Sequence, residues 1–392
     1  MIKIPDYVGV SAFGLKMGAI VPGCDLLGMV GERLENCYRD QLLEDGDVIC
    51  LTESVLARSQ NNFVTLAEIT ADVISKLKLR PDASLGVLFP ILSRNRFSMI
   101  LKALAAAVPQ GRVVVQLSHP ADEVGNQLLP EEVSNQLAIL TGSSINPDDL
   151  PEHYLHPITQ VDYIELYRNI VAEQGAKAEI LICNDPLRML EEKLDGIVIA
   201  SIHQRFKFKK QLDQHSVNSI TLQDLCCSPD NTAYSEWGLL GSNMSSGDKL
   251  KLAPREANQT ADELQALVKE KMGKQVEVII YGDGAYCDPT THIYELADPQ
   301  PAFGITRGLE NRFREGLKYK YLADKLWDEG LTPEHIEAHI AANRGRVSER
   351  DAIESEGTTP RKAEDLIASL ADLISGSADA GTPLILVKNF LS

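Results

Sequence analysis

The fold is decided by the stretch Val276-Glu-Val-Ile-Ile-Tyr-Gly-Asp-Gly-Ala-Tyr-Cys-Asp-Pro-Thr-Thr-His-Ile-Tyr-Glu-Leu-Ala-Asp-Pro299, in which an apolar run leads into a group of acids. The β-branched run from Val276 to Ile280 predicts a buried strand, because such a run leaves little surface for water. Gly282 and Gly284 then permit backbone angles that other residues avoid. The chain can therefore turn sharply and hold Asp283 at the carboxyl end of the strand, where open sheets commonly bind ligands.

Four more ionisable residues follow in the same stretch, namely Asp288, His292, Glu295 and Asp298. So many carboxylates repel one another unless a positive charge lies among them, and a hard divalent cation is the simplest candidate. The alternative is an acidic surface turn between two strands. Both interpretations stay open at this point.

The whole chain limits the classes of partner. Its 392 residues are enough for two or three domains, and a content of 44% hydrophobic and 24% charged residues is typical of a globular protein. A net charge of −18 repels phosphate backbones and anionic lipid headgroups, so we expect neither nucleic acid nor membrane as a partner. The chain has no long apolar run and no apolar signal-peptide core near Met1, which predicts a cytoplasmic protein.

A second candidate site follows the predicted strand Val48–Thr52. Thr52 and Ser54 offer hydroxyl groups, and Arg58 adds a positive charge a few residues further on. Hydroxyls and a guanidinium at the end of a strand can bind a phosphate group. The alternative is that these residues form the solvated start of a helix.

Residues 67–235 alternate between predicted helices and strands. The strands are expected at 85–92, 112–118, 178–183 and 196–202, and helices near 94–107, 162–174 and 204–213. Alternation of this kind favours a doubly wound, mostly parallel sheet.

Polar residues follow three of these strands and give a set of candidate substrate contacts: His119, Asp185, His203 and Arg205. The carboxyl ends of parallel strands share one edge of the sheet, so these residues could line one crevice. Helix capping explains Asp185 equally well, because it precedes a proline. The basic run 205–210 is either a solvated helix face or a place that attracts an anion.

Two further segments lie near the carboxyl end of the chain. Residues 311–356 are charged and helical, and we expect a mobile helical insertion there. Residues 375–383 are small, which lets backbone amides approach a phosphate group. A plain helix-to-strand connection is the alternative for this loop.

Four blocks of the chain resemble the coenzyme F-420 gamma-glutamyl ligase family. They are Ile20-Val-Pro-Gly-Cys-Asp-Leu26, residues 45–61, residues 238–283 and Gly381-Thr-Pro-Leu-Ile-Leu-Val387. Members of that family use GTP and a divalent metal to add glutamate to the lactate-phosphate tail of a deazaflavin cofactor. The resemblance therefore implies an ATP- or GTP-dependent ligase that joins an amino acid to an acidic or phosphorylated small molecule.

The resemblance also implies roles for individual residues. The implied catalytic residues are Asp283 and Arg58. The implied nucleotide contacts are Lys16, Ile20, Glu53, Ser54, Arg58, Asn243, Gly284, Ser377 and Gly381. The implied ligands of Mg²⁺ or Mn²⁺ are Asp283, Asp288 and Asp379. Leu240 stands where the family has its first metal-binding aspartate, so either another acid replaces that ligand or one metal binds instead of two.

The expected fold class is α/β. An α+β ligase-like domain, formed by residues 1–66 and 236–392, is expected to receive a Rossmann-like insertion at 67–235. The resemblance implies a homodimer. Two other functions stay open: a nucleotide- or metabolite-binding protein that has lost catalysis, and separate chemistry in the inserted unit.

Overall fold

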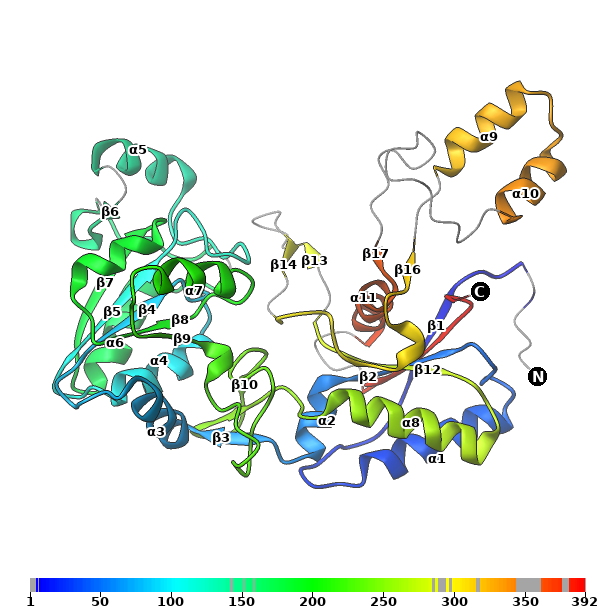
Figure 1. Ribbon diagram of the computed structural model, residues 1–392, viewed down its shortest axis with the longest axis horizontal. Helices are drawn as coiled ribbons and strands as arrows, with labels where there is room; N and C mark the ends of the chain where they lie inside the picture. Colours follow the sequence, from blue (N-terminus) through cyan, green and yellow to red (C-terminus); the bar gives the residue numbers. More distant parts are fainter. Residues whose placement is uncertain are drawn as a thin grey trace.

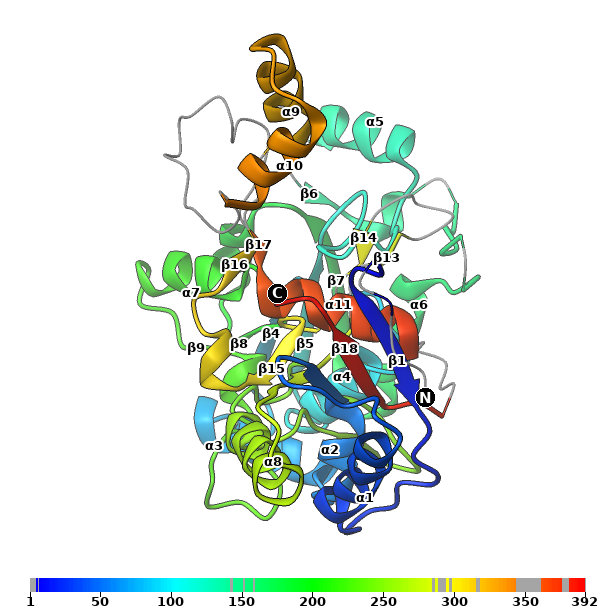
Figure 2. The ribbon, with the colours of Figure 1, turned by 90° about the vertical axis from the view of Figure 1, so that its right-hand side faces the viewer.

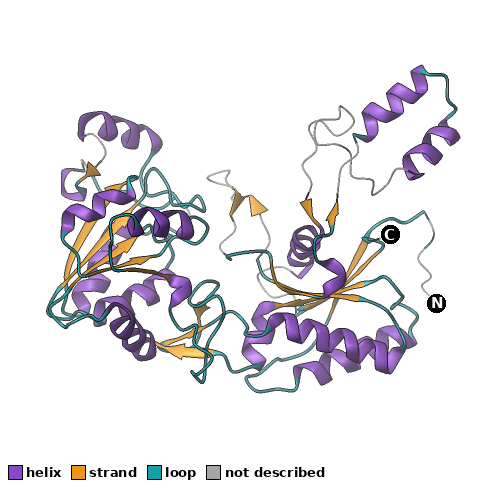
Figure 3. Ribbon diagram, viewed as in Figure 1, coloured by secondary structure: helices purple, strands orange, loops and turns teal. Residues whose placement is uncertain are grey.

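The computed structural model describes residues 5, 7–141, 144–150, 152–157, 159–283, 286–287, 294–295, 298–314, 318–342, 361–375 and 381–391. The chain forms two units side by side, each built around its own sheet (Figures 1 and 3). The mixture of helices with parallel and antiparallel strands confirms the α/β class. Within the described ranges, no helix has the length and apolar character needed to cross a membrane.

The first unit contains a five-stranded sheet. Its strands, in spatial order, are β1 (Ser11–Leu15), β18 (Leu384–Lys388), β2 (Val48–Thr52), β12 (Glu277–Tyr281) and β15 (Ala302–Ile305). Strands β2 and β12 run parallel, and every other pair is antiparallel. Strands β1, β2 and β12 therefore end at the same edge of the sheet, where β18 begins.

Helices cover both faces of this sheet (Figure 2). Helices α1 (Leu26–Arg39) and α8 (Ala257–Met272) pack on one face, and α11 (Ala363–Ser375) packs on the other. Helix α1 begins where the Asp25 side chain accepts a hydrogen bond from the Gly28 N–H at 2.9 Å. The strands are buried on both sides, which explains their nearly continuous apolar sequences.

The second unit contains a six-stranded sheet. In spatial order its strands are β6 (Ser144–Ile145), β7 (Lys177–Cys183), β5 (Arg112–Leu117), β4 (Ser84–Leu88), β8 (Gly196–Ile199) and β9 (Ser219–Thr221). All are parallel except β6 at the edge. Numbered along the chain, the parallel strands lie in the order 3-2-1-4-5, and the chain reverses its direction of winding beside β4. The predicted doubly wound, mostly parallel sheet is confirmed.

Two layers of helices enclose this second sheet. Helices α3 (Leu66–Leu77), α4 (Phe97–Ala106) and α6 (Tyr163–Glu173) contribute to the larger core on one face. Helix α7 (Arg205–Asp213) and the short helix η2 (Pro186–Glu192) form a smaller core on the other face. Helix α5 (Glu131–Thr141) lies beyond β5 in the sequence, at the outer end of this unit (Figure 1).

A small sheet of β10 (Asn243–Met244), β11 (Lys249–Lys251) and β3 (Phe63–Thr65) lies where the two units join. Val64 and Leu250 pack into the core of the second unit, although they lie outside residues 67–235. The expected division at residues 66 and 236 stays a prediction. The packing shows that the second unit uses residues from both flanking segments.

The segment after β15 carries a projecting pair of helices (Figures 1 and 2). Strands β16 (Phe313–Arg314) and β17 (Arg361–Lys362) pair at its base, and α9 (Tyr319–Asp328) and α10 (Pro333–Ala342) pack on each other. The helical character expected for 311–356 is present in its described part, and its mobility stays a prediction. The remaining short elements are β13 (Tyr286–Cys287), β14 (Tyr294–Glu295), α2 (Glu53–Ser59), η1 (Pro147–Asp149), η3 (Leu222–Asp224) and η4 (Arg307–Leu309).

Candidate functional site

Several residues expected to form the site gather at one edge of the first sheet. Leu15, Leu384, Leu51 and Ile280 lie in register across four neighbouring strands, so the segments just beyond them share that edge. The Met17 N–H donates to the Gly381 carbonyl at 3.3 Å, which places the segment after β1 beside the segment before β18. The structure thereby brings the segments carrying Lys16, Glu53, Asp283 and Gly381 to one edge of the sheet.

Glu53 is buried at this edge and forms an ion pair with Lys251 of β11. The Lys251 Nζ lies 2.7 Å from both Glu53 carboxylate oxygens, and the two residues are only 8% and 9% exposed. Burial raises the pKa of Glu53 to about 7, although Lys251 opposes the shift. Both oxygens of Glu53 accept hydrogen bonds from Lys251, and the expected contact of Glu53 with a nucleotide stays a prediction.

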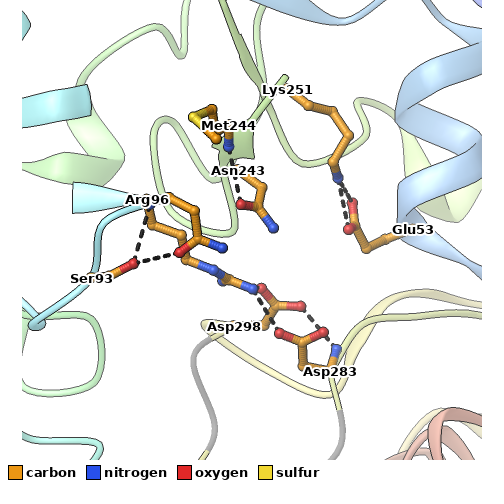
Figure 4. Close-up of polar contacts among 9 residues, drawn as sticks. Glu53, Ser93, Arg96, Asn243, Met244, Lys251, Asp283 and Asp298 are labelled. Atoms are coloured by element: carbon orange, nitrogen blue, oxygen red, sulfur yellow. Dashed lines mark hydrogen bonds and ion pairs between the residues drawn. The ribbon is translucent and has the colours of Figure 1, made fainter. Parts of the chain in front are cut away.

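Arg96 of the second unit joins two carboxylates of the first (Figure 4). Its Nη2 lies 2.8 Å from Asp283 Oδ2, and its Nη1 lies 3.0 Å from Asp298 Oδ1. The Asp283 backbone N–H donates to Asp298 Oδ2 at 2.9 Å, which holds the two acids together. One guanidinium therefore bridges two carboxylates, as its fork of N–H donors allows.

Burial and nearby charges control the ionisation of these groups. Burial, with a smaller effect from the Asp298 charge, raises the pKa of Asp283 to about 6, although Arg96 opposes both effects. Burial alone would lower the pKa of Arg96, but the two aspartates outweigh that effect and raise it. The guanidinium therefore stays charged, and it favours the charged form of Asp283.

Gly282 makes room for Asp298, which is 2% exposed. A Cβ atom at Gly282 would lie only 2.5 Å from Asp298 Oδ2, whereas one at Gly241 would make an ordinary contact, 3.5 Å from Asp298 Oδ1. Gly282 thus permits the close approach of the buried acid, and a side chain there would displace it.

The loop after β4 positions Arg96. The Arg96 N–H donates to Ser93 Oγ at 3.2 Å, and Ser93 Oγ donates to Asn95 Oδ1 at 2.8 Å. Arg96 directly precedes α4 and was not among the residues predicted from the sequence. One feature of the sequence could have identified it: Arg96 is a cation at the start of the helix that follows the parallel strand β4. Functional residues are common at this position.

The other residues implied to bind the nucleotide have different environments. Ser54 and Arg58 are exposed four residues apart on α2, and Lys16 is exposed after β1. Within the described part of the chain, Arg58 has no ion pair. Ile20 is half-buried and packs on the core of the first unit. Asn243 is half-buried, its Oδ1 accepts from the Met244 N–H at 3.0 Å, and its side chain points toward the region between the two ion pairs (Figure 4).

The four candidate substrate residues of the second unit have partners within that unit. His119 is buried, and its Nδ1 lies 2.7 Å from Ser134 Oγ. Arg205 is 6% exposed and donates to Gln223 Oε1 at 2.9 Å and to the Ile202 carbonyl, and burial lowers its pKa. Asp185 accepts a hydrogen bond from the Leu187 N–H at 3.0 Å, as the capping alternative predicted, and the His203 N–H donates to Glu123 at 3.2 Å.

The described residues offer two ligands for one divalent cation. Asp283 and Asp298 direct carboxylate oxygens at the Arg96 guanidinium. Carboxylate oxygens are also the ligands that Mg²⁺ and Mn²⁺ prefer. No group of three or more His, Cys, Asp or Glu side chains suited to a metal occurs in the described segments. Leu240 is buried at 2% exposure, and its side chain has no oxygen to offer a metal. Among the described residues, Asp283 and Asp298 could therefore offer side-chain oxygens to a cation only in the position that the Arg96 guanidinium takes.

Four implied site residues, Gly284, Asp288, Ser377 and Asp379, lie outside the described residues. Glu295 lies in β14, and its side chain is not among those described. Their proposed contacts with nucleotide and metal stay predictions.

Comparison with known proteins identifies the family of the chain. A model of the protein family described as F420-0:Gamma-glutamyl ligase matches residues 14–389, so the match includes the second unit as well as the first. No curated protein matches the chain. Because the family match covers nearly the whole sequence, the chain belongs to the F420-0:Gamma-glutamyl ligase family.

Proposed function

We propose that the protein is an amide ligase that depends on a nucleoside triphosphate, GTP or ATP, and on Mg²⁺ or Mn²⁺. It would join an amino acid, glutamate by family resemblance, to an acidic or phosphorylated small molecule. The observation that supports this most directly is the Arg96 bridge between Asp283 and Asp298 at the edge where β1, β2 and β12 end. Family membership supports the ligase class.

The proposal rests on an exchange of ionic partners. Arg96 now neutralises Asp283 and Asp298. A metal–nucleotide complex would bring a cation for the two carboxylates and phosphate groups for Arg96, so no buried charge would be left unpaired. A cation held by the two aspartates would reduce the negative charge on the phosphate groups of the nucleotide.

Residues of the first unit would bind the rest of the nucleotide. Arg58 is exposed and has no ion pair in the described part of the chain, so its guanidinium is available to a phosphate. The Ser54 hydroxyl lies one helical turn before Arg58 and would donate a hydrogen bond. Lys16 lies beyond β1 at the same edge of the sheet and adds a third positive or donor group.

Isothermal titration calorimetry tests the proposal. GTP and ATP are titrated with MgCl₂ or MnCl₂ into the wild type, Asp283→Asn and the surface control Asp82→Asn, whose side chain is 63% exposed. We expect metal-dependent binding of at least one nucleotide to the wild type and the control, and its loss in Asp283→Asn. Absence of binding for both nucleotides with both metals would contradict the proposal.

A second candidate is a nucleotide- or metabolite-binding protein without catalysis. Buried Leu240 favours it, because its apolar side chain cannot bind a metal where the family has its first metal-binding aspartate. If Asp283→Ala leaves ligand affinity unchanged while the ligand still raises the melting temperature, this second function is supported over the first.

The expected homodimer is also a proposal. Leu373 and Ile374 at the end of α11 expose 67% and 40% of their surface, which a partner subunit could cover. Size-exclusion chromatography with light scattering measures the mass directly. A mass of one chain at micromolar concentration would contradict the dimer.

A further inference from the structure

A cavity of about 630 Å³ adjoins the candidate site and receives residues from both units. The loop after β4 contributes Arg94, the loop after β5 contributes Asn126, and the beginning of α6 contributes Tyr163. Met244 of β10 and Asp283 complete the wall that faces the first unit. The volume falls in the range typical of small-molecule pockets.

The position of the cavity favours ligand binding. It lies beyond the carboxyl ends of β4 and β5, and β4 is the strand beside which the winding of the second sheet reverses. Open α/β sheets bind their ligands at this edge. Asp283 lines the same cavity, so a molecule bound there would lie next to the proposed metal and nucleotide site.

Arg94 supplies an available positive charge. It is exposed, and within the described part of the chain its guanidinium forms no ion pair or hydrogen bond, whereas the Arg96 guanidinium two residues later binds two aspartates. Burial raises the pKa of Tyr163, and the Arg94 charge opposes that shift, so the two side chains are close enough to interact electrostatically. On a chain with a net charge of −18, a free guanidinium in a cavity attracts anions selectively.

The walls of the cavity are held in place by Asp122. Its Oδ2 accepts from the Leu92 N–H at 2.7 Å, and its Oδ1 accepts from the Val124 and Asn126 N–H groups at 3.1 and 2.8 Å. These bonds join the loop after β4 to the loop after β5. Leu92 and Val124 are buried and give part of the lining an apolar character.

We propose that this cavity binds the acidic acceptor of the ligase reaction, with Arg94 pairing with a carboxylate or phosphate group of that molecule. The acceptor class is a small organic anion with an apolar portion, which would contact Leu92, Val124 and Met244. This inference rests on the proposed function for the role of the bound molecule. The binding site itself stands on the cavity and on Arg94.

Binding of two simple probes tests the site. Phenyl phosphate and benzoate are titrated into the full-length wild type and four variants: Arg94→Gln, Arg94→Glu, Arg94→Lys and Arg80→Gln. Arg80 is the matched control, because it lies at the opposite end of β4 and its side chain is 74% exposed. We expect at least one probe to bind, a loss of tenfold or more in Arg94→Gln and Arg94→Glu, recovery in Arg94→Lys, and a change below twofold in Arg80→Gln.

Further measurements separate this site from the nucleotide site. GTP or ATP affinity is measured on the same variants, and we expect it to be unchanged in Arg94→Gln. The acceptor site is overturned if neither probe binds the wild type, if Arg94→Gln binds the probes as tightly as the wild type does, or if saturating nucleotide displaces them. If a probe binds in an Arg94-dependent way but the protein binds no nucleotide, the proposed anion site is supported and the proposed ligase function is contradicted.

Discussion

The Arg96 guanidinium and the Asp283 carboxylate lie 2.8 Å apart, although the two residues are 187 positions apart in the chain and belong to different units. Neither unit alone contains both members of this ion pair. The second unit is therefore part of the candidate site, because it supplies the cation that balances two acids of the first unit.

Replacement of Arg96 by methionine should destabilise the protein. The variant leaves the Asp298 carboxylate, only 3% exposed, and the partly exposed Asp283 carboxylate without their cation. We expect a loss of about 3 kcal/mol in the free energy of unfolding, at the lower end for a broken buried pair because the Asp283 side chain is 35% exposed. Urea denaturation measures this change. The exposed control Arg80→Met should lose less than about 0.5 kcal/mol, and an equal loss in both variants would contradict the structural role of Arg96.

Metal binding should need Asp298 as well as Asp283. We expect MnCl₂ to raise the melting temperature of the wild type and of Asp82→Asn, and to leave Asp283→Asn and Asp298→Asn unchanged. EDTA should reverse the increase and abolish nucleotide binding. An Asp298→Asn variant that responds to manganese like the wild type would show that the metal has other ligands.

Asp122 should make stability depend on pH. Burial raises the pKa of Asp122 from its ordinary value of 3.8 to about 6, against its hydrogen bonds from backbone and Asn126 donors. The folded chain therefore holds this proton more tightly than the unfolded chain. The protonated Asp122 carboxyl therefore adds to the free energy of unfolding. This contribution is fully present below about pH 4 and is lost as pH rises through 6.

The variant Asp122→Asn isolates this effect, because it has no proton to lose. We expect the wild type to lose about 2 kcal/mol more than the variant in unfolding free energy between pH 4 and pH 8. Urea denaturation at several pH values across that range gives the unfolding free energy of each protein as a function of pH, and the two curves are then compared. Parallel pH profiles would show that Asp122 keeps an ordinary pKa in the folded protein.

Asn62 should be important for the junction between the units. Its side chain is fully buried, donates to the Tyr234 and Ala253 carbonyls at 2.8 and 2.9 Å, and accepts from the Tyr234 N–H at 3.1 Å. We expect Asn62→Ala to cost about 2–3 kcal/mol, because it leaves buried backbone groups unpaired. The exposed Asn231→Ala is the control in the same denaturation assay. A loss below about 1 kcal/mol for Asn62→Ala would mean that water replaces these bonds.

Local sequence patterns were sufficient to locate most elements of the fold. The strand Val48–Thr52 has the predicted bounds, and the strand predicted at 178–183 differs by one residue. Apolar runs and helical spacing carry this information because they depend on near neighbours. The end of the strand predicted at 196–202 was wrong, since β8 stops at Ile199, where the chain turns and Glu123 binds the following N–H groups.

The site was less predictable, because it depends on contacts between distant segments. The position of Asp283 at the end of a strand was predicted from the apolar run and the glycines that follow it. Arg96 could not be assigned from its neighbours, because its partners Asp283 and Asp298 are distant in sequence and belong to a different unit. Arg205 illustrates the reverse case: its basic run suggested an anion site, whereas its guanidinium bonds Gln223 and Ile202 inside the second unit.

Asn62 has one more consequence. Its amide ties together the points at which the backbone departs toward the second sheet and later returns from it. A segment whose two ends meet can be gained, lost or replaced as one piece while the receiving strands keep their register. If the second unit holds the acceptor, as proposed above, variation in length at this one point would change acceptor preference without disturbing the first sheet.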